Sequence, residues 1–343
     1  MFKQDYIQFF KSLSMELKYF FGSFINEASY HYYFLWFLSS FAFLYLYFVF
    51  IDKLSFSQIK QRLADYVFSK RVQTEFYKDL YFIAIKFLYK PFVIGFLAFN
   101  FYEINAFFEK SVLVDIFQMS EPVIQMKGFP GAFLTGILLF LYLDLCSFVR
   151  HYITHKVKWL WYFHMTHHMA TSLSPLTKTR EHPLYHIFNM SLRIILAFPG
   201  TLFIFSLIGS NQESSDLIVL VLALIFFQFN LHLRHSPFPI SYGFLDKVLM
   251  SPYMHQVHHS KLEKHWDKNF GVALSIWDRM AGTLYIPAKG ESLEFGVDTP
   301  FEIKGDISSG FYDLMLPYFL IKKDLFSRRS AGKRAVELKK NAA

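Results

Sequence analysis

The sequence is poor in charge and has almost no cysteine, and each shortage excludes a class of protein. Charged residues make up 18% of the 343 residues, against about 25% in an ordinary soluble domain. Because 53% of the residues are hydrophobic, the chain is far too apolar to be intrinsically disordered. Cys146 is the only cysteine, so no disulfide can form within the chain and a disulfide-stabilised scaffold is excluded.

The apolar residues occur in long blocks rather than in amphipathic periods, which is typical of a membrane protein. A helix needs about 20 mostly apolar residues to cross the hydrocarbon core of a bilayer. Five blocks reach or approach this length, namely residues 33–51, 80–102, 132–149, 188–209 and 217–233. The second and fifth blocks could instead be re-entrant. The sequence therefore predicts an all-α integral membrane protein with four to six transmembrane helices.

The distribution of Lys and Arg between the blocks predicts their orientation. Basic residues gather in three regions, 52–79, 150–187 and 234–343, and they are scarce in the loops between. Basic loops stay on the cytoplasmic side, so five spans with an external N-terminus fit the alternation. The formal net charge of +8 is then explained by topology and anionic lipid. No nucleic-acid partner is expected.

The chain divides by composition into three parts. Residues 1–130 should hold a first helix, which either lies in the membrane interface or packs as a cap on the other helices, followed by two membrane helices; a cleavable signal is not expected. Residues 131–290 contain nearly all of the histidines, and residues 291–343 should form a cytoplasmic C-terminal segment. The histidines and the basic regions around them lie on the same predicted side, so we expect a cytoplasmic, histidine-rich cap above the membrane helices.

Thirteen of the 14 histidines lie between residues 151 and 265, and eight of them form three clusters. The clusters read HxxxH, HxxHH and HxxHH, and they contain His151 and His155, then His164, His167 and His168, then His255, His258 and His259. Residues three and four apart share one face of a helix, and neutral imidazole is a common metal ligand. Eight imidazoles exceed what one tetrahedral ion needs, so the sequence predicts two metal ions.

Two local details affect whether the clusters can meet. His155 and His164 are nine residues apart, about 900° of rotation on an ideal helix, which puts them on opposite faces. If both clusters serve one site, the chain must bend within residues 156–161. Ser251 fits the N-cap of a new helix, and Pro252 fits its first position. Among the other histidines, His182 and His235 are the stronger further candidates, whereas His232 and His265 are weaker ones and His31 and His186 should have only local roles.

The histidine clusters and the residues around them resemble the fatty acid hydroxylase superfamily, which includes sterol desaturases and sterol C4-methyl oxidases. The resemblance runs from about residue 143 to 285. It includes the segments 180–184, 251–260, 269–271 and 277–285. It implies a membrane base with a cytoplasmic cap and a dinuclear iron site that activates O2. One departure is that Ser236-Pro237 follows His235, where the family often has a small residue and Asn.

The ligand set that the clusters and the resemblance imply together has ten members, namely His151, His155, His164, His167, His168, His182, His235, His255, His258 and His259. Imidazole suits Zn, Cu and Ni as well as Fe, so two iron ions are expected from the resemblance, and zinc could occupy the site in isolated protein. Asp144, Asn269, Asp278 and Arg279 are candidates to orient the imidazoles through hydrogen bonds, or alternatively to pair helix ends and close loops.

The expected function is a membrane-bound oxygenase that hydroxylates or desaturates a lipid C–H bond with O2 and two electrons. The electrons should come from a separate donor protein, because neither a cytochrome b5 motif nor an iron–sulfur cysteine set is present. Sterol, hopanoid, fatty acyl, sphingoid and ether lipid all stay open as substrates, in either a bacterial inner membrane or the ER. The alternatives are a zinc-dependent membrane hydrolase or isomerase, which needs a carboxylate base, and a non-enzymatic metal or haem carrier.

Overall fold

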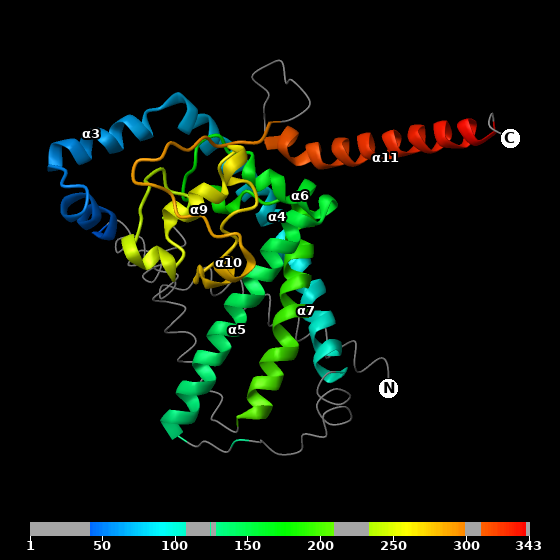
Figure 1. Ribbon diagram of the computed structural model, residues 1–343, viewed down its shortest axis with the longest axis horizontal. Coiled ribbons are helices and arrows are strands. Elements are labelled where there is room, and N and C mark those ends of the chain that lie inside the picture. Colours follow the sequence, from blue (N-terminus) through cyan, green and yellow to red (C-terminus); the bar gives the residue numbers. More distant parts are fainter. Residues whose placement is uncertain (1–41, 108–123, 125–127, 209–232, 299–309, 341–343) are drawn as a thin grey trace. The chain divides into compact units, whose positions relative to one another are not determined.

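The computed structural model describes residues 42–107, 124, 128–208, 233–298 and 310–340 (Figure 1). The described residues are mostly helical and form no named strand, which confirms the helical part of the prediction. The expected interfacial helix in the first 30 residues lies outside the described residues. So do the first part of the 33–51 block and nearly all of the 217–233 block.

The chain divides into two compact units, and each is assembled from three separate segments. The first unit contains Met1–Val67, Lys86–Asp144 and Arg193–Arg234. The second unit contains Phe68–Ile85, Leu145–Leu192 and His235–Ala343. Three long helices each contribute residues to both units, namely α4 (Lys70–Phe107), α5 (Gly128–Lys156) and α7 (Pro183–Leu207). All of the histidines between 151 and 186, and those from 235 onward, therefore belong to the second unit.

Two described helices are long and apolar enough to cross a membrane. They are Phe129–Lys156 within α5 and Pro183–Ile204 within α7. In the first unit the two helices pack closely, because Gly200 leaves room for the ring of Tyr142, which donates a hydrogen bond to the carbonyl of Leu196. A side chain at position 200 would occupy the same space as that ring. The first unit also contains residues 42–50, which are helical, and α3 (Phe56–Val67).

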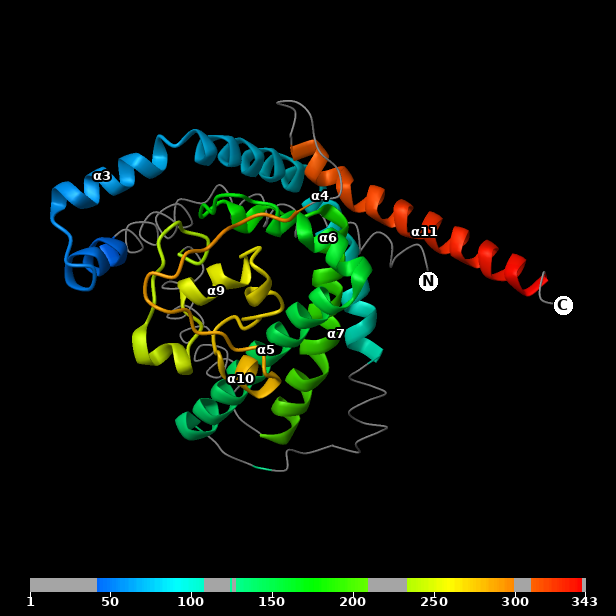
Figure 2. The ribbon, with the colours of Figure 1, turned by 45° about the horizontal axis from the view of Figure 1, so that its top comes forward.

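The second unit consists of short helices joined by well-packed loops. They are α6 (Lys158–His168), η2 (Thr177–Thr179), η3 (Gly243–Lys247), α9 (Pro252–His258), η4 (Glu263–His265), α10 (Ile276–Ala281) and the longer α11 (Gly310–Lys340). Buried Met165 on α6 packs against Leu316 and Leu320 on α11. Figures 1 and 2 show α9 beside α6 and the C-terminal end of α5, so three histidine-bearing helices lie next to one another.

The predicted bend between the first two histidine clusters is confirmed. α5 ends at Lys156, α6 begins at Lys158, and Val157 between them has an extended backbone with φ −91° and ψ 106°. One extended residue changes the direction of the chain enough to bring both clusters to one place. The predicted start of α9 is also confirmed, since Ser251 is the N-cap and Pro252 opens the helix, although the Ser251 side chain makes no capping hydrogen bond.

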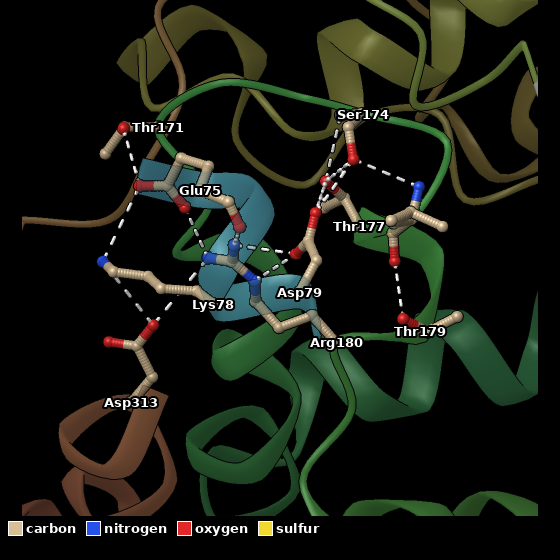
Figure 3. A network of polar contacts seen from close by, with 10 residues as sticks. Glu75, Lys78, Asp79, Thr171, Ser174, Thr177, Thr179, Arg180 and Asp313 are labelled. Atoms are coloured by element: carbon tan, nitrogen blue, oxygen red, sulfur yellow. Dashed lines mark hydrogen bonds and ion pairs between the residues drawn. The ribbon is translucent and has the colours of Figure 1, made fainter. Parts of the chain in front are cut away.

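A buried group of charged side chains fastens α4, the 171–182 loop and α11 together (Figure 3). We call it the ion cluster, and its members are Glu75, Lys78, Asp79, Arg180 and Asp313. The guanidinium of Arg180 is fully buried and lies 2.7 Å from a carboxylate oxygen of Glu75 and 2.8 Å from one of Asp79. It also lies 3.8 Å from a carboxylate oxygen of Asp313. The ion cluster thereby fixes the loop that follows α6.

Candidate metal centre

Nine of the ten predicted ligands meet in two groups within the second unit. The five-histidine group contains His151, His155, His164, His168 and His258, and the four-histidine group contains His167, His235, His255 and His259. In each group every residue offers one ring nitrogen, and these nitrogens all lie within 4.8 Å of one another. The nine side chains come from α5, α6, α9 and the loop before η3, so the fold collects them from four separate elements.

Each HxxHH box divides its histidines between the two groups, and the two boxes do so in opposite ways. On α6, His164 and His168 are one helical turn apart and join the five-histidine group, while His167 joins the other group. On α9 and its C-cap, His255 and His259 join the four-histidine group, while His258 joins the five-histidine group. The repeated motif thus has a geometric cause: each box supplies both groups at once.

The nitrogen–nitrogen distances suit coordination of a small ion. In the four-histidine group, Nε2 of His235 lies 3.1–3.2 Å from Nε2 of His167, His255 and His259. In the five-histidine group, Nε2 of His164 and Nε2 of His168 are 3.2 Å apart. Imidazole nitrogens that bind one first-row metal at about 2.0–2.1 Å are separated by about 2.9–3.4 Å when they are neighbours in its coordination sphere.

The buried nitrogens of these groups call for a cation. Nε2 of His155 is buried without a hydrogen-bond partner among the described residues, and leaving such an atom unsatisfied is costly. Rings that direct nitrogens to one point present lone pairs that repel one another, or N–H groups that collide. A metal ion accepts all of the lone pairs together, so the residues present fit two bound transition metals.

Two of the candidate ligands have their outer ring nitrogen, Nδ1, fixed by the backbone. Nδ1 of His151 lies 2.9 Å from the carbonyl oxygen of Phe270, and Nδ1 of His258 lies 2.8 Å from that of Lys268. A carbonyl can only accept, so each Nδ1 carries the proton and donates it. Nε2 of each ring then keeps its lone pair for the metal, which is the usual arrangement for a ligating histidine.

The electrostatics of the centre keep the imidazoles neutral. Burial, followed by repulsion from neighbouring histidines, holds the pKa values of His164, His168 and His259 well below their usual range. Burial also lowers the pKa of His167 to about 4, although Glu181 opposes the shift. Neutral imidazole is the form that binds metals, so these side chains are ready to coordinate at physiological pH.

Asn269 and Asp278, two of the predicted orienting residues, act on the loop that holds the imidazoles. The carboxylate of Asp278 accepts hydrogen bonds from the N–H groups of Phe270 at 2.8 Å and Gly271 at 2.7 Å. The amide of Asn269 donates to the carbonyl of Met254 at 2.9 Å. Both contacts fix the loop whose carbonyls accept from His151 and His258. Sequence could not reveal these acceptors, because backbone carbonyls carry no residue signature.

Asp144 and Arg279, the other two predicted orienting residues, are placed differently. Asp144 is buried and belongs to the first unit, whereas the histidines of both groups belong to the second unit. Arg279 is exposed and donates to the carbonyl of Lys247 at 2.8 Å. The contact of Arg279 matches the structural alternative, since it joins α10 to η3.

His182, the tenth predicted ligand, lies in neither group. Its Nδ1 accepts a hydrogen bond from the N–H of Leu184 at 3.1 Å, and its ring packs on Phe163 and Tyr318. Burial lowers its pKa to about 4. The 169–181 loop does return towards α6, but the ring of His182 meets aromatic side chains there. His182 thus lies outside both groups, in a position that fits a packed core histidine, and its role as a ligand stays a prediction.

Two further described histidines, His265 and His186, each lie close to a carboxylate. His265 is buried and its Nε2 lies 3.0 Å from a carboxylate oxygen of Glu291. His186 lies 3.3 Å from a carboxylate oxygen of Glu181. Neither belongs to a group of potential ligands among the described residues, and His31 and His232 lie outside those residues.

A cavity of about 330 Å³ opens onto rings of both groups. Its walls include His155, His168 and His259 together with Trp161 and Trp266. Trp161 packs against His155 with ring centroids 4.6 Å apart, a contact that the sequence did not predict. Two carboxylates also line the cavity, and both pair with lysines: Asp267 lies 2.6 Å from Lys156 and Asp298 lies 3.7 Å from Lys261.

Comparisons with known proteins agree with the sequence resemblance. Residues 136–283 match the family model described as fatty acid hydroxylase. The chain is 26% identical over 207 residues to an ornithine lipid hydroxylase of Rhizobium tropici, covering 57% of this chain and 56% of that protein. It is 28% identical over 171 residues to the alkylglycerol monooxygenase of Xenopus tropicalis, covering 48% of this chain and 33% of that protein.

The human alkylglycerol monooxygenase is 26% identical over 175 residues, which are 51% of this chain and 36% of that protein. The alignments thus span about half or less of these relatives, and no solved structure matches the chain. The matched region contains all nine histidines of the two groups. The resemblance is confirmed, since residues 136–283 of this chain match the model of the fatty acid hydroxylase family.

Proposed function

We propose that this chain is a membrane-bound, metal-dependent oxygenase that hydroxylates or desaturates a C–H bond of a lipid. The observation that carries the proposal is the pair of histidine groups, whose buried, neutral imidazoles converge on two points inside the family region. The relatives support a lipid substrate, because those named are a hydroxylase of ornithine lipid and monooxygenases of alkylglycerol. Sterol-like and fatty-acyl lipids both remain within the proposal.

We assign two iron ions to the site, one to each group. The bound ions would supply activation of O2 and removal of hydrogen from an unactivated carbon, with two electrons from a separate donor protein. The chain supplies the ligands, and the carbonyls of Lys268 and Phe270 fix the rings of His258 and His151 in the ligating tautomer. Trp161 and Trp266 form an aromatic part of the wall of the cavity beside the ligands.

A zinc-dependent hydrolase is the competing function, and the arrangement of carboxylates argues against it. A hydrolase of this type needs a carboxylate base close to the metal-bound water. Both candidate groups consist of histidines alone among the described residues. The cavity carboxylates Asp267 and Asp298 already pair with lysines, and both are substantially exposed. No observation of the described part favours the hydrolase.

Isotopic labelling of the product separates the possible reactions. Membranes that contain the full chain would be incubated with a lipid extract and NADH or NADPH, either under ¹⁸O2 or in H2¹⁸O. A hydroxylase places label from O2 in the lipid, and a desaturase removes two hydrogens without adding label. A hydrolase takes label from water and needs no reductant. A variant with His255→Ala and His259→Ala is the inactive control, and His186→Ala is the matched active control. Label from water alone would overturn the proposal.

We also propose that both groups face the cytoplasm, as the basic regions around them indicate. Residues 150–187 and 234–343 carry five and sixteen basic residues respectively. Accessibility tags after Lys178 and after Lys261 should both react only from the cytoplasmic side of sealed vesicles. Tags that react from opposite sides would contradict a single site built from all three clusters.

A further inference from the structure

η3 and α10 lie side by side in the second unit and are joined by several hydrogen bonds. The backbone N–H of Ser275 donates to the carbonyl of Val248 at 2.9 Å, and its hydroxyl donates to the carbonyl of Asp246 at 2.9 Å. Arg279 donates to the carbonyl of Lys247 at 2.8 Å, and Leu249 pairs with Leu274. The two segments therefore form one rigid surface rather than two independent loops.

This surface presents large apolar side chains to the outside. We call it the η3–α10 face, and it consists of Phe244, Leu245, Lys247, Val248, Arg279 and Met280. Phe244 and Met280 are each 79% exposed, and Leu245 and Val248 are 40% and 48% exposed. Single exposed apolar residues are ordinary, but several on one rigid surface mark a site of interaction.

The exposed charges of the face are all positive. Lys247 and Arg279 are exposed, whereas the two acidic residues of the same segments, Asp246 and Asp278, are fully buried. Asp246 accepts hydrogen bonds from Ser241 and Tyr242, and Asp278 accepts from the loop beside the metal centre. The fold thus turns the carboxylates inward and leaves an apolar surface with basic residues, which complements an anionic partner.

We propose that the η3–α10 face rests on an anionic lipid surface. Phe244 and Met280 would enter the boundary between headgroups and acyl chains, and Lys247 and Arg279 would pair with lipid phosphates. A lipid bilayer is the occupant we choose because the basic residues of the face complement anionic headgroups, and because two described helices are long and apolar enough to cross a membrane. The inference concerns attachment to lipid and does not require the oxygenase activity.

The face is also mechanically close to the metal centre. Asp278, which holds Phe270 and Gly271, lies one and two residues before Arg279 and Met280 on the same short helix, α10. The carbonyl of Phe270 in turn accepts from His151. Contact with lipid at α10 would therefore fix the depth of the five-histidine group relative to the headgroups, where a lipid substrate is found.

Depth-dependent fluorescence on the full chain tests this contact. Cys146 is buried, so a Cys146→Ser background allows one fluorophore to be attached at Phe244→Cys or at Met280→Cys. The matched control is Glu263→Cys, an exposed acidic position on η4 of the same unit. Each labelled protein is placed in nanodiscs of phosphatidylcholine and phosphatidylglycerol. Quenching is measured with brominated lipids, which act inside the bilayer, and with iodide, which acts in water.

The labels at 244 and 280 should be quenched severalfold more by brominated lipid than the label at 263, and they should be protected from iodide. Lys247→Glu should reduce lipid quenching at 244 severalfold, most strongly at low salt, while Lys247→Arg should preserve it. Iodide quenching at 244 and 280 equal to that at 263 would overturn the proposal. Protection from iodide without quenching by lipid would overturn it as well, because protein rather than lipid would then cover the face.

Discussion

The metal centre and the ion cluster are both buried in the second unit, yet their charges are balanced in different ways. The ion cluster holds three carboxylates and two cationic side chains within contact distance of one another. The metal centre holds nine histidines and no carboxylate, and burial lowers the pKa values of His164, His168 and His259. The charges of the first region are nearly balanced by the chain itself, whereas the second consists of histidines that would be completed by the metal ions we propose.

This difference implies that the two regions stabilise the second unit in different ways. Contacts within the ion cluster join α4, the loop before α7 and α11 whether or not metal is present. The metal centre joins α5, α6 and α9, and its contribution depends on occupancy, because binding to the folded state alone adds stability by mass action. Substitutions in the two regions should therefore be distinguishable by their response to added metal.

The largest expected effect is loss of one metal and of activity. His155→Ala with His164→Ala removes two ligands of the five-histidine group, and His255→Ala with His259→Ala removes two of the other group. Wild-type protein should bind close to two ions per chain, and each double variant about one, since losing even a group that only orients a ligand costs about 10–100-fold in affinity. Elemental analysis of purified protein measures the change. His186→Ala is the control, and equal metal loss in all three variants would contradict the grouping.

Arg180→Met should destabilise the fold next most strongly. It leaves Glu75, Asp79 and Asp313 buried with only Lys78 as a cation, and removing one partner of a buried ion pair costs about 3–5 kcal/mol. Thermal unfolding in detergent should show the loss, and excess metal should not restore it. Arg71→Met, which removes an exposed side chain of the same helix that bonds Thr171, is the matched control and should change stability little. Equal losses of stability in Arg180→Met and Arg71→Met would show that the ion cluster does not stabilise the fold.

Asp313→Asn should change the stability of the fold less than Arg180→Met does. At neutral pH it should stabilise the fold rather than destabilise it. Burial raises the pKa of Asp313 to about 6 from 3.8, against the opposing influence of Lys78 and Arg180. The folded state therefore holds the proton more tightly than the unfolded state. This group's contribution to stability is full below pH 4 and is lost as the pH rises to 6, at a cost of about 3 kcal/mol.

The side chain that Asp313→Asn introduces is neutral at every pH. The difference in stability between Asp313→Asn and wild type should thus be near zero at pH 4 and should favour the variant at pH 7. Unfolding is measured for both proteins across this range, so that protonation of metal ligands affects both alike. A difference that does not vary with pH would contradict the raised pKa.

His182→Ala should have the smallest effect of the series. The ring lies in neither histidine group, and it packs on Phe163 and Tyr318. We expect the variant to keep both metals and to lose about 1–2 kcal/mol of stability through lost packing and one hydrogen bond. Metal analysis and thermal unfolding measure the two quantities. Loss of a metal from His182→Ala, in protein that still folds, would restore it to the ligand set that the sequence predicted.

The sequence anticipated much of the metal centre because the ligands occur at helical spacings. The HxxHH boxes on α6 and α9 and the bend at Val157 follow from rotation along a helix. His182 could not be resolved in this way, because its position depends on a loop and on aromatic packing with Tyr318 far along the chain. The ion cluster was also missed, since Glu75, Arg180 and Asp313 are more than 100 residues apart in sequence and are brought together only by tertiary structure.

Each HxxHH box supplies histidines to both groups, and this limits which mutations the two helices can tolerate. His258 and His259 are neighbours in sequence but belong to different histidine groups. A single residue inserted before them turns the rest of α9 by about 100° and moves one histidine out of each group at the same time. A substitution removes one ligand from one ion. Changes of length inside α6 or α9 should therefore be far more damaging than changes of residue, whereas the loops between the boxes can absorb them.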